Sequence, residues 1–277
     1  MKIAVSNLKG GVGKTTVTQN LAVCFASMGY KVCIVDSATS QSSLAWFGVR
    51  DSGLKSLTVV GATDVKALNK TIDALYREYD IILIDGTPSL GEMTTRIILA
   101  ADLLIIPILP SGHDFRSIEK LFVRYELATE TAGKQIPVYF LLNRYSENVR
   151  VHSGMKELLE EHGVPVLKTT LRERVAYVAT GIEGMGVLEY DDPKAIEEVV
   201  ALTKEIIGIA ATPLPTEQPR QEHAKHMGRP PTRIDATVRI SVDMPKPLFK
   251  RVKKKLVDME ITMIEYMNQL VQKDMEG

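Results

Sequence analysis

Short apolar runs alternate with longer amphipathic segments along most of the chain, from residue 2 to residue 207. The apolar runs are rich in Ile, Val and Leu at successive positions, which is typical of strands that are buried on both faces of a parallel sheet. We expect strands at Lys2–Ser6, Lys31–Asp36, Leu57–Val60, Ile81–Asp85, Leu103–Ile108, Val138–Asn143 and Val164–Lys168.

The amphipathic segments between these runs predict helices. They lie near Thr15–Met28, Val65–Glu78, Ser117–Thr131, Val149–Glu161 and Pro193–Ile207. Strands that alternate with helices at this spacing indicate right-handed βαβ units. The pattern therefore predicts an α/β domain over residues 1–210, built on a doubly wound, mostly parallel sheet.

The pattern changes after Ile209. Residues 211–235 are rich in proline and have no periodicity, so we expect a flexible linker there. From residue 236 the run TVRISV alternates strictly, and two helical patterns follow it, the second with a capping box at Thr262 and Glu265. So short a segment cannot bury a core alone, and we expect residues 236–277 to form a small dimerising domain.

Charge is distributed unevenly along a chain whose formal net charge is zero. From Arg220 to Leu256 there are eleven Lys or Arg residues and three acidic residues, which suggests a basic segment that binds a polyanion. The two cysteines, Cys24 and Cys33, lie in apolar runs and read as buried thiols rather than redox or metal groups. No apolar run approaches the length of a membrane span, so we expect a cytoplasmic protein.

A glycine-rich loop, NLKGGVGKTT at residues 7–16, follows the first expected strand. Its glycines allow the backbone to turn N–H groups toward phosphate oxygens, and the next helix presents its positive end to the same anion. Lys14 is placed to reach the β- and γ-phosphates, and the Thr15 hydroxyl to ligate Mg²⁺. The loop therefore predicts binding of ATP and Mg²⁺.

One detail narrows the class of phosphate loop. The general pattern has a glycine six residues before the lysine, but Leu8 stands there and Lys9 follows it. KGGVGKTT resembles the deviant Walker A box of the ParA/MinD family, IIPILPSGHDF resembles its switch segment, and residues 169–192 resemble the closing segment of its plasmid-partition branch. A first strand at the very start of the chain is expected of the short partition ATPases, which lack an N-terminal DNA-binding extension.

The resemblance implies an ATP-dependent homodimer. In that family the extra lysine, here Lys9, reaches across a nucleotide-sandwich dimer to the phosphates of the partner. The residues expected to bind nucleotide are Lys9, Gly10, Gly11, Val12, Gly13, Lys14, Thr15 and Thr16. Asn143, in YFLLNRYSE, resembles the adenine-side strand end, although asparagine at a strand end is also a common turn residue.

Two acids end apolar strands. Asp85 resembles the Walker B aspartate that holds Mg²⁺ through water. Asp36 matches the first acid of the family's D-x-D-P-Q pattern, which helps to organise Mg²⁺ and the switch. Together with Thr15, these are the expected metal-site residues, and the resemblance assigns catalytic roles to Lys9, Lys14 and Asp36.

The second acid of that pattern, which positions the attacking water, is replaced by Ala38. A methyl group cannot orient water, so we expect slow hydrolysis. Two explanations are open. Gln41 or a hydroxyl takes over in a naturally diverged enzyme, or an Asp→Ala change was introduced to trap the ATP-bound dimer. We favour the second, because everything else needed for binding and dimerisation is intact.

The basic C-terminal segment resembles a ribbon-helix-helix DNA-binding domain, in which strands from two chains enter the major groove. The resemblance implies base contacts from Thr237, Arg239 and Ser241, and a phosphate contact at Thr262. On the ATPase domain, Arg172 and Arg174 are candidates for nonspecific DNA contacts, but they fit solvated arginines equally well.

The leading hypothesis is a DNA partition ATPase that acts on the nucleoid, released by a ParB-like or cargo-adaptor protein that stimulates hydrolysis. A related hypothesis is positioning of a protein cargo such as a carboxysome or chemotaxis cluster. A nucleotide-controlled repressor is a third. A MinD-like membrane ATPase is a fourth, because LFKRVKKKL is a basic amphipathic helix, but the strand before it and the capped helix after it favour DNA.

Overall fold

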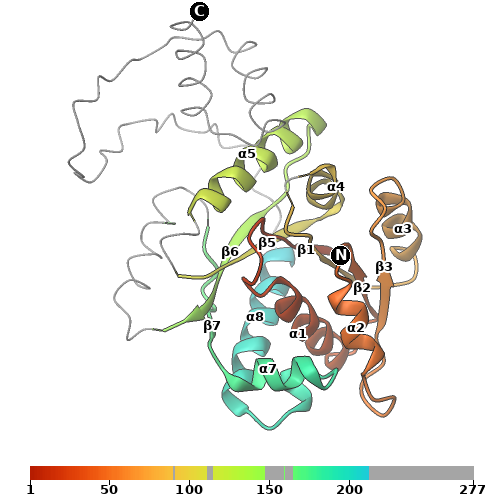
Figure 1. The fold of residues 1–277 in the computed structure, drawn as a ribbon, viewed down its shortest axis with the longest axis vertical. Coiled ribbons are helices and arrows are strands. Elements are labelled where there is room, and N and C mark those ends of the chain that lie inside the picture. The colour runs from red at the N-terminus through yellow and green to blue at the C-terminus, as the bar shows by residue number, and fades with distance from the viewer. Residues whose placement is uncertain (90, 111–114, 147–158, 160–164, 212–277) are drawn as a thin grey trace, which may run out of the picture.

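The computed structural model describes residues 1–89, 91–110, 115–146, 159 and 165–211 (Figure 1). Its centre is a sheet of parallel strands in the order β3-β2-β4-β1-β5-β6-β7. The strands are β1 (Lys2–Val5), β2 (Val32–Asp36), β3 (Thr58–Gly61), β4 (Ile81–Asp85), β5 (Leu103–Ile108), β6 (Val138–Tyr145) and β7 (Leu171–Arg172). The predicted α/β class is confirmed for this part of the chain, while the tail at residues 236–277 lies outside the described residues.

Helices cover both faces of the sheet (Figure 1). They are α1 (Lys14–Ser27), α2 (Ser42–Gly48), α3 (Leu68–Leu75), α4 (Glu92–Ala100), α5 (Phe115–Ala132), α7 (Val175–Ile182) and α8 (Pro193–Ala211), with a 3-10 turn η1 at Val187–Glu189. None of the described helices is long and apolar enough to cross a membrane.

The core has two halves because successive strand residues point to opposite faces. Ile3 and Val5 of β1 pack with the buried faces of α1 and α8, whereas Ala4 packs with those of α3, α4 and α5. Every residue of β2 and β4 is buried. Sandwiching the sheet between two apolar layers explains why its strands read as continuous apolar runs.

The last strand differs from the prediction. The expected strand at Val164–Lys168 is wrong as placed: Val166 forms only an isolated bridge to Phe140, and β7 lies further along. The cause is in α8, where the Glu205 carboxylate accepts the backbone N–H groups of Lys168 and Thr169 at 2.7 and 2.9 Å. The expected helix at Val149–Glu161 falls largely outside the described residues.

The parallel order brings the carboxyl ends of the strands to one edge of the sheet. The carboxyl ends of β1, β2, β4, β5 and β6 all lie there, and in such sheets this edge is where ligands bind. β1 runs into the glycine-rich loop, β2 ends at Asp36 and β4 ends at Asp85. The fold thus gathers residues that are far apart in the sequence.

Candidate nucleotide site

The glycine-rich loop joins β1 to α1 and depends on glycine geometry. Gly11 and Gly13 have φ values of +74° and +93°, a region that side chains disfavour. A Cβ at Gly13 would lie 2.2 Å from Nδ2 of Asn143, whereas Gly10 and Gly11 border open space. No side chain caps the start of α1, so its first N–H groups face the loop. This arrangement suits a polyanion.

Lys14 is the buried cation of the loop. Its side chain lies in the first turn of α1, and its Nζ donates to the carbonyl of Lys9 at 2.9 Å. Burial lowers the pKa of Lys14, and the nearby Asp85 carboxylate opposes that change. The loop therefore holds a lysine ammonium within reach of both its own backbone and a strand-end acid.

Asp85 has one carboxylate oxygen that is unaccounted for. The side chain is fully buried, and its Oδ2 accepts the Ser43 hydroxyl at 2.8 Å. The nearby Thr15 hydroxyl acts to lower the pKa of this carboxyl group, against the larger effect of burial, yet Oδ1 is buried with no hydrogen-bond partner in the structure. A buried orphan oxygen calls for an explanation, and a divalent cation or a water bound to it supplies one. The residues present therefore fit Mg²⁺.

Burial also changes the acidity of this group. It raises the pKa of Asp85 to about 6, with a smaller contribution from the negative charge of Asp36 in the same direction. Asp36 and Asp85 are direct neighbours across β2 and β4. Two carboxylates this close repel one another, and a cation between them and the phosphates would relieve that repulsion.

The Asp36 carboxylate accepts hydrogen bonds from backbone N–H groups in this structure. Its Oδ1 accepts the N–H of Ala38 at 3.1 Å, and its Oδ2 accepts the N–H groups of Ser43 and Leu44 at 2.8 and 3.1 Å. The carboxylate thereby folds residues 37–41 into a loop and fixes the start of α2. Asp36 and Asp85 are brought together as the sequence predicts, but the direct contacts of Asp36 are to main chain.

Ala38 sits in this loop with 7% of its surface exposed. Its carbonyl accepts the N–H of Gln41 at 3.0 Å in a tight turn, and Gln41 has a left-handed φ of +47°. The Gln41 side-chain amide lies beside Gly61 at the end of β3. Because β2 and β4 separate β3 from β1, this conformation aims Gln41 away from the glycine-rich loop.

Two asparagines brace the loop. Asn143 Nδ2 donates to the carbonyl of Val12 at 2.8 Å, so this side chain contacts loop backbone. The second, Asn7, was not singled out from the sequence: its Nδ2 donates to the carbonyl of Pro107 at 2.8 Å, and its Oδ1 accepts the N–H of Lys9 at 3.0 Å. Asn7 is buried, and a polar residue directly after a buried strand was the available signal.

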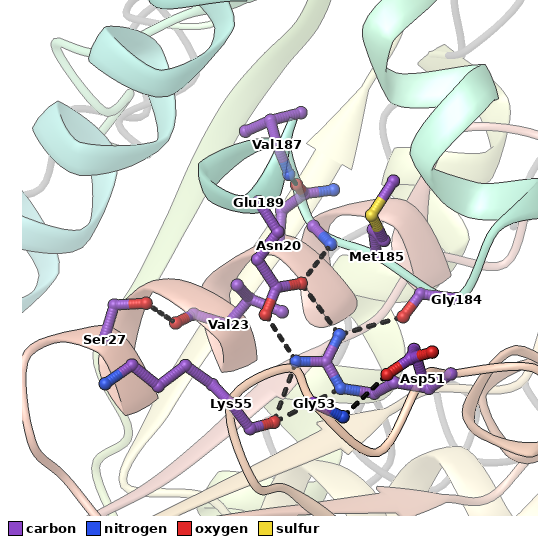
Figure 2. A network of polar contacts seen from close by, with 12 residues as sticks. Asn20, Val23, Ser27, Asp51, Gly53, Lys55, Gly184, Met185, Val187 and Glu189 are labelled. Carbon is purple, nitrogen blue, oxygen red and sulfur yellow. Dashed lines mark hydrogen bonds and ion pairs between the residues drawn. The ribbon is translucent and has the colours of Figure 1, made fainter. Parts of the chain in front are cut away.

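The helix that follows Asp36 is anchored from its other end (Figure 2). Just past α2, Arg50 donates to both carboxylate oxygens of Glu189 at 2.5 and 2.8 Å, and to the carbonyls of Gly184 and Lys55. Within α2, Trp46 Nε1 donates to the carbonyl of Met185 at 3.1 Å. The turn at residues 184–189 thus holds α2 in place.

The expected DNA-contacting residues are far less defined. Arg172 is exposed, whereas the Arg174 guanidinium donates to Glu198 at 2.5 and 3.0 Å, which offsets its charge. The tail residues Thr237, Arg239, Ser241 and Thr262 lie outside the described residues. A DNA role for any of these residues stays a prediction.

A parallel sheet with a glycine-rich loop after its central strand, a buried loop lysine and a strand-end acid defines a P-loop nucleotide-binding protein. The sequence profile of the CobQ/CobB/MinD/ParA nucleotide binding domain matches residues 3–187. The chain belongs to this family, and the resemblance to ParA and MinD proteins is confirmed. It is therefore a member of a family of nucleotide-binding ATPases.

Two curated relatives match this chain over nearly all of their own length. The maintenance of carboxysome distribution protein A of Halothiobacillus neapolitanus is 27% identical, and the match covers 74% of this chain and 95% of that protein. The sporulation initiation inhibitor protein Soj of Bacillus subtilis is 23% identical over 74% of this chain and 97% of its own length.

Solved structures support the same fold. A plasmid partition protein of Borrelia burgdorferi bound to AMPPNP is 21% identical with a TM-score of 0.61, and covers 75% of this chain and 98% of its own. MinD of Pyrococcus horikoshii with Mg-ADP is 23% identical with a TM-score of 0.60, over 76% and 97% of the two chains. An Asp-to-Ala variant of Cyanothece McdA with ATP is 16% identical with a TM-score of 0.63, over 75% and 96%.

Proposed function

We propose that the chain is a ParA-type partition ATPase that binds ATP and Mg²⁺ and closes into a homodimer on nucleoid DNA. The observation that carries the nucleotide part is the orphan Oδ1 of Asp85 beside Thr15 and Lys14, at the end of an open glycine-rich loop. Lys14 and the loop N–H groups hold the phosphates, and Thr15 and Asp85 hold Mg²⁺, directly or through water. When bound there, the cation would supply positive charge that neutralises the phosphates.

Asn143 and Asp36 have supporting roles in this proposal. Asn143 clamps the loop through the Val12 carbonyl and lies at the end of β6, beside the expected position of the base. Asp36 organises the loop at residues 37–41, which carries Ala38. Because Ala38 offers no group that orients water, the ATP-bound dimer of this chain is long-lived.

Removal of the Lys9 charge tests the dimer. The Lys9→Ala variant is expected to stay monomeric with ATP and Mg²⁺, whereas the parent chain dimerises, because the lysine contributes a charge-assisted contact to the partner's phosphates. Light scattering after gel filtration measures this, with ATP and with ADP. Since the tail is expected to dimerise by itself, both proteins are also compared as chains that end at residue 211.

Lys70→Ala is the matched control, because Lys70 is an exposed lysine on α3. It removes the same charge and is expected to leave ATP-dependent pairing unchanged. ATP-dependent dimers of Lys9→Ala at the parent concentration range would contradict the sandwich arrangement.

DNA binding is proposed for both parts of the chain, with sequence preference supplied by the tail. Deleting the residues after Ala210 is expected to abolish preference for a specific site and to leave weaker, ATP-dependent, salt-sensitive binding. In the full chain, Arg239→Ala is expected to alter the preferred sequence. Filter binding at several salt concentrations, with and without ATP, measures both. Unchanged sequence preference after the deletion would exclude the tail as the reader.

A protein cargo is the second candidate. It is favoured by the match to the carboxysome distribution protein, which covers nearly all of that protein. In this alternative an adaptor protein on the cargo replaces the ParB-like partner, and the dimer still uses nonspecific nucleoid DNA. If the intact chain binds DNA only nonspecifically, with no preference for any site, this alternative is favoured over partition of a DNA molecule.

A further inference from the structure

Ser43 joins the two strand-end acids. It lies in the first turn of α2 and is fully buried. Its backbone N–H donates to Oδ2 of Asp36 at 2.8 Å, and its hydroxyl donates to Oδ2 of Asp85 at 2.8 Å. One residue thus makes a main-chain contact with one acid and a side-chain contact with its neighbour in the sheet.

The contact with Asp85 is selective for one oxygen. Ser43 occupies Oδ2, while Oδ1 of the same carboxylate has no hydrogen-bond partner in the structure. A hydrogen bond to one oxygen restricts the rotation of a carboxylate, so it also orients the other oxygen. Oδ1 is the atom that the proposed function assigns to Mg²⁺ or its water.

The position of Ser43 is itself fixed from two sides. At the start of α2, Asp36 accepts the N–H groups of Ser43 and Leu44. Toward the end of the helix, Trp46 and then Arg50 are bonded to the turn at residues 184–189. The hydroxyl is therefore presented by a helix with little freedom to move, which is what positioning of a metal ligand requires.

We propose that Ser43 is a positioning residue for the magnesium site, which aligns Asp85 Oδ1 toward the cation without binding the cation itself. The inference rests on the proposed nucleotide and Mg²⁺ binding. It also gives Asp36 an indirect route to the metal: Asp36 fixes the helix start, the helix start fixes Ser43, and Ser43 fixes Asp85. Loop 37–41 and the metal site are then linked through one hydroxyl.

The test is the Mg²⁺ dependence of nucleotide binding by the full chain. A fluorescent ATP analogue is titrated at a series of Mg²⁺ concentrations and in EDTA, for the parent and for Ser43→Ala. The Mg²⁺ concentration at half-maximal binding is expected to rise about tenfold in Ser43→Ala, as is usual when the outer partner of a metal ligand is lost. Affinity in EDTA is expected to change less than twofold, as an order-of-magnitude limit for a contact that acts only through the cation.

Two further variants frame the result. Ser43→Thr keeps a hydroxyl and is expected to restore the parent Mg²⁺ midpoint. Ser42→Ala removes the exposed neighbouring hydroxyl, which bonds Ser40, and is expected to change nothing. Thermal unfolding without nucleotide confirms that each variant is folded.

The outcomes are separable. A Ser43→Ala midpoint equal to that of the parent, or an equal loss of binding in EDTA, would show that Ser43 only packs, and the inference would fail. A Ser43→Thr variant that behaves like Ser43→Ala would have the same meaning. If the parent itself binds the analogue without any Mg²⁺ dependence, the proposed function fails instead.

Discussion

The Ala38→Asp variant is expected to hydrolyse ATP about 10²-fold faster than the parent chain in single-turnover experiments, a typical effect for a positioned general base or water-orienting group. Ala38 lies in the loop between Asp36 and α2, and its side chain has no polar atom. A carboxylate there would accept a hydrogen bond from the attacking water, while the loop geometry is kept by Asp36. Rapid-quench measurement of ADP formed on pre-bound ATP gives the rate.

The competing explanation predicts different behaviour. If Gln41 orients water in this chain, Gln41→Ala should slow hydrolysis by the parent, and Ala38→Asp should add little. The structure aims the Gln41 amide toward Gly61 at the end of β3, so we expect Gln41→Ala to leave the parent rate unchanged. Equal rates for the parent and Ala38→Asp would remove the argument that a water-positioning carboxylate is missing.

The Arg50→Ala variant is expected to lower the free energy of unfolding by about 3–5 kcal/mol, the usual loss when one member of a buried ion pair is removed. The side chains of Arg50 and Glu189 are only 4% and 8% exposed. Without the guanidinium, the Glu189 carboxylate and the carbonyls of Gly184 and Lys55 lose donors. Urea denaturation followed by circular dichroism measures the change.

An exposed ion pair provides the matched control. Arg96 pairs with Glu92 one turn earlier in α4, and the two side chains are 33% and 66% exposed. Arg96→Ala is expected to cost about 0–1 kcal/mol, because water screens such pairs. The double variant Arg50→Met with Glu189→Leu should cost less than Arg50→Ala alone, since neither charge is then left buried without a partner. Equal losses in Arg50→Ala and Arg96→Ala would show that the buried network adds nothing.

The sheet was largely predictable from the sequence, because strands covered on both faces must be apolar at every position. The exceptions have tertiary causes. β7 at Leu171–Arg172 has two residues and no apolar run, and Glu205 of α8 takes the backbone groups upstream of it. Helix α2 begins with serines and has seven residues, so periodicity could not reveal it; the Asp36 carboxylate determines where it starts.

The candidate site likewise has features that the sequence predicts and contacts that it does not. The glycine-rich loop and Asp85 were predictable, because the loop chemistry is local and the acid ends an apolar strand. The contacts of Asn7 and Ser43 were not, because they join segments that meet only through the strand order. Asn143 was placed at the correct edge of the sheet, but its contact with Val12 depends on how closely β6 approaches the loop.

The bond from Lys14 Nζ to the carbonyl of Lys9 has a consequence for assembly. A triphosphate oxygen is a stronger acceptor than an amide carbonyl, so nucleotide capture would exchange one acceptor for another on the same ammonium. The carbonyl released in that exchange belongs to the residue whose own side chain is expected to extend to a second subunit. Nucleotide binding by one subunit would then be coupled to binding of the second subunit, because the backbone carbonyl and the side chain involved both belong to Lys9.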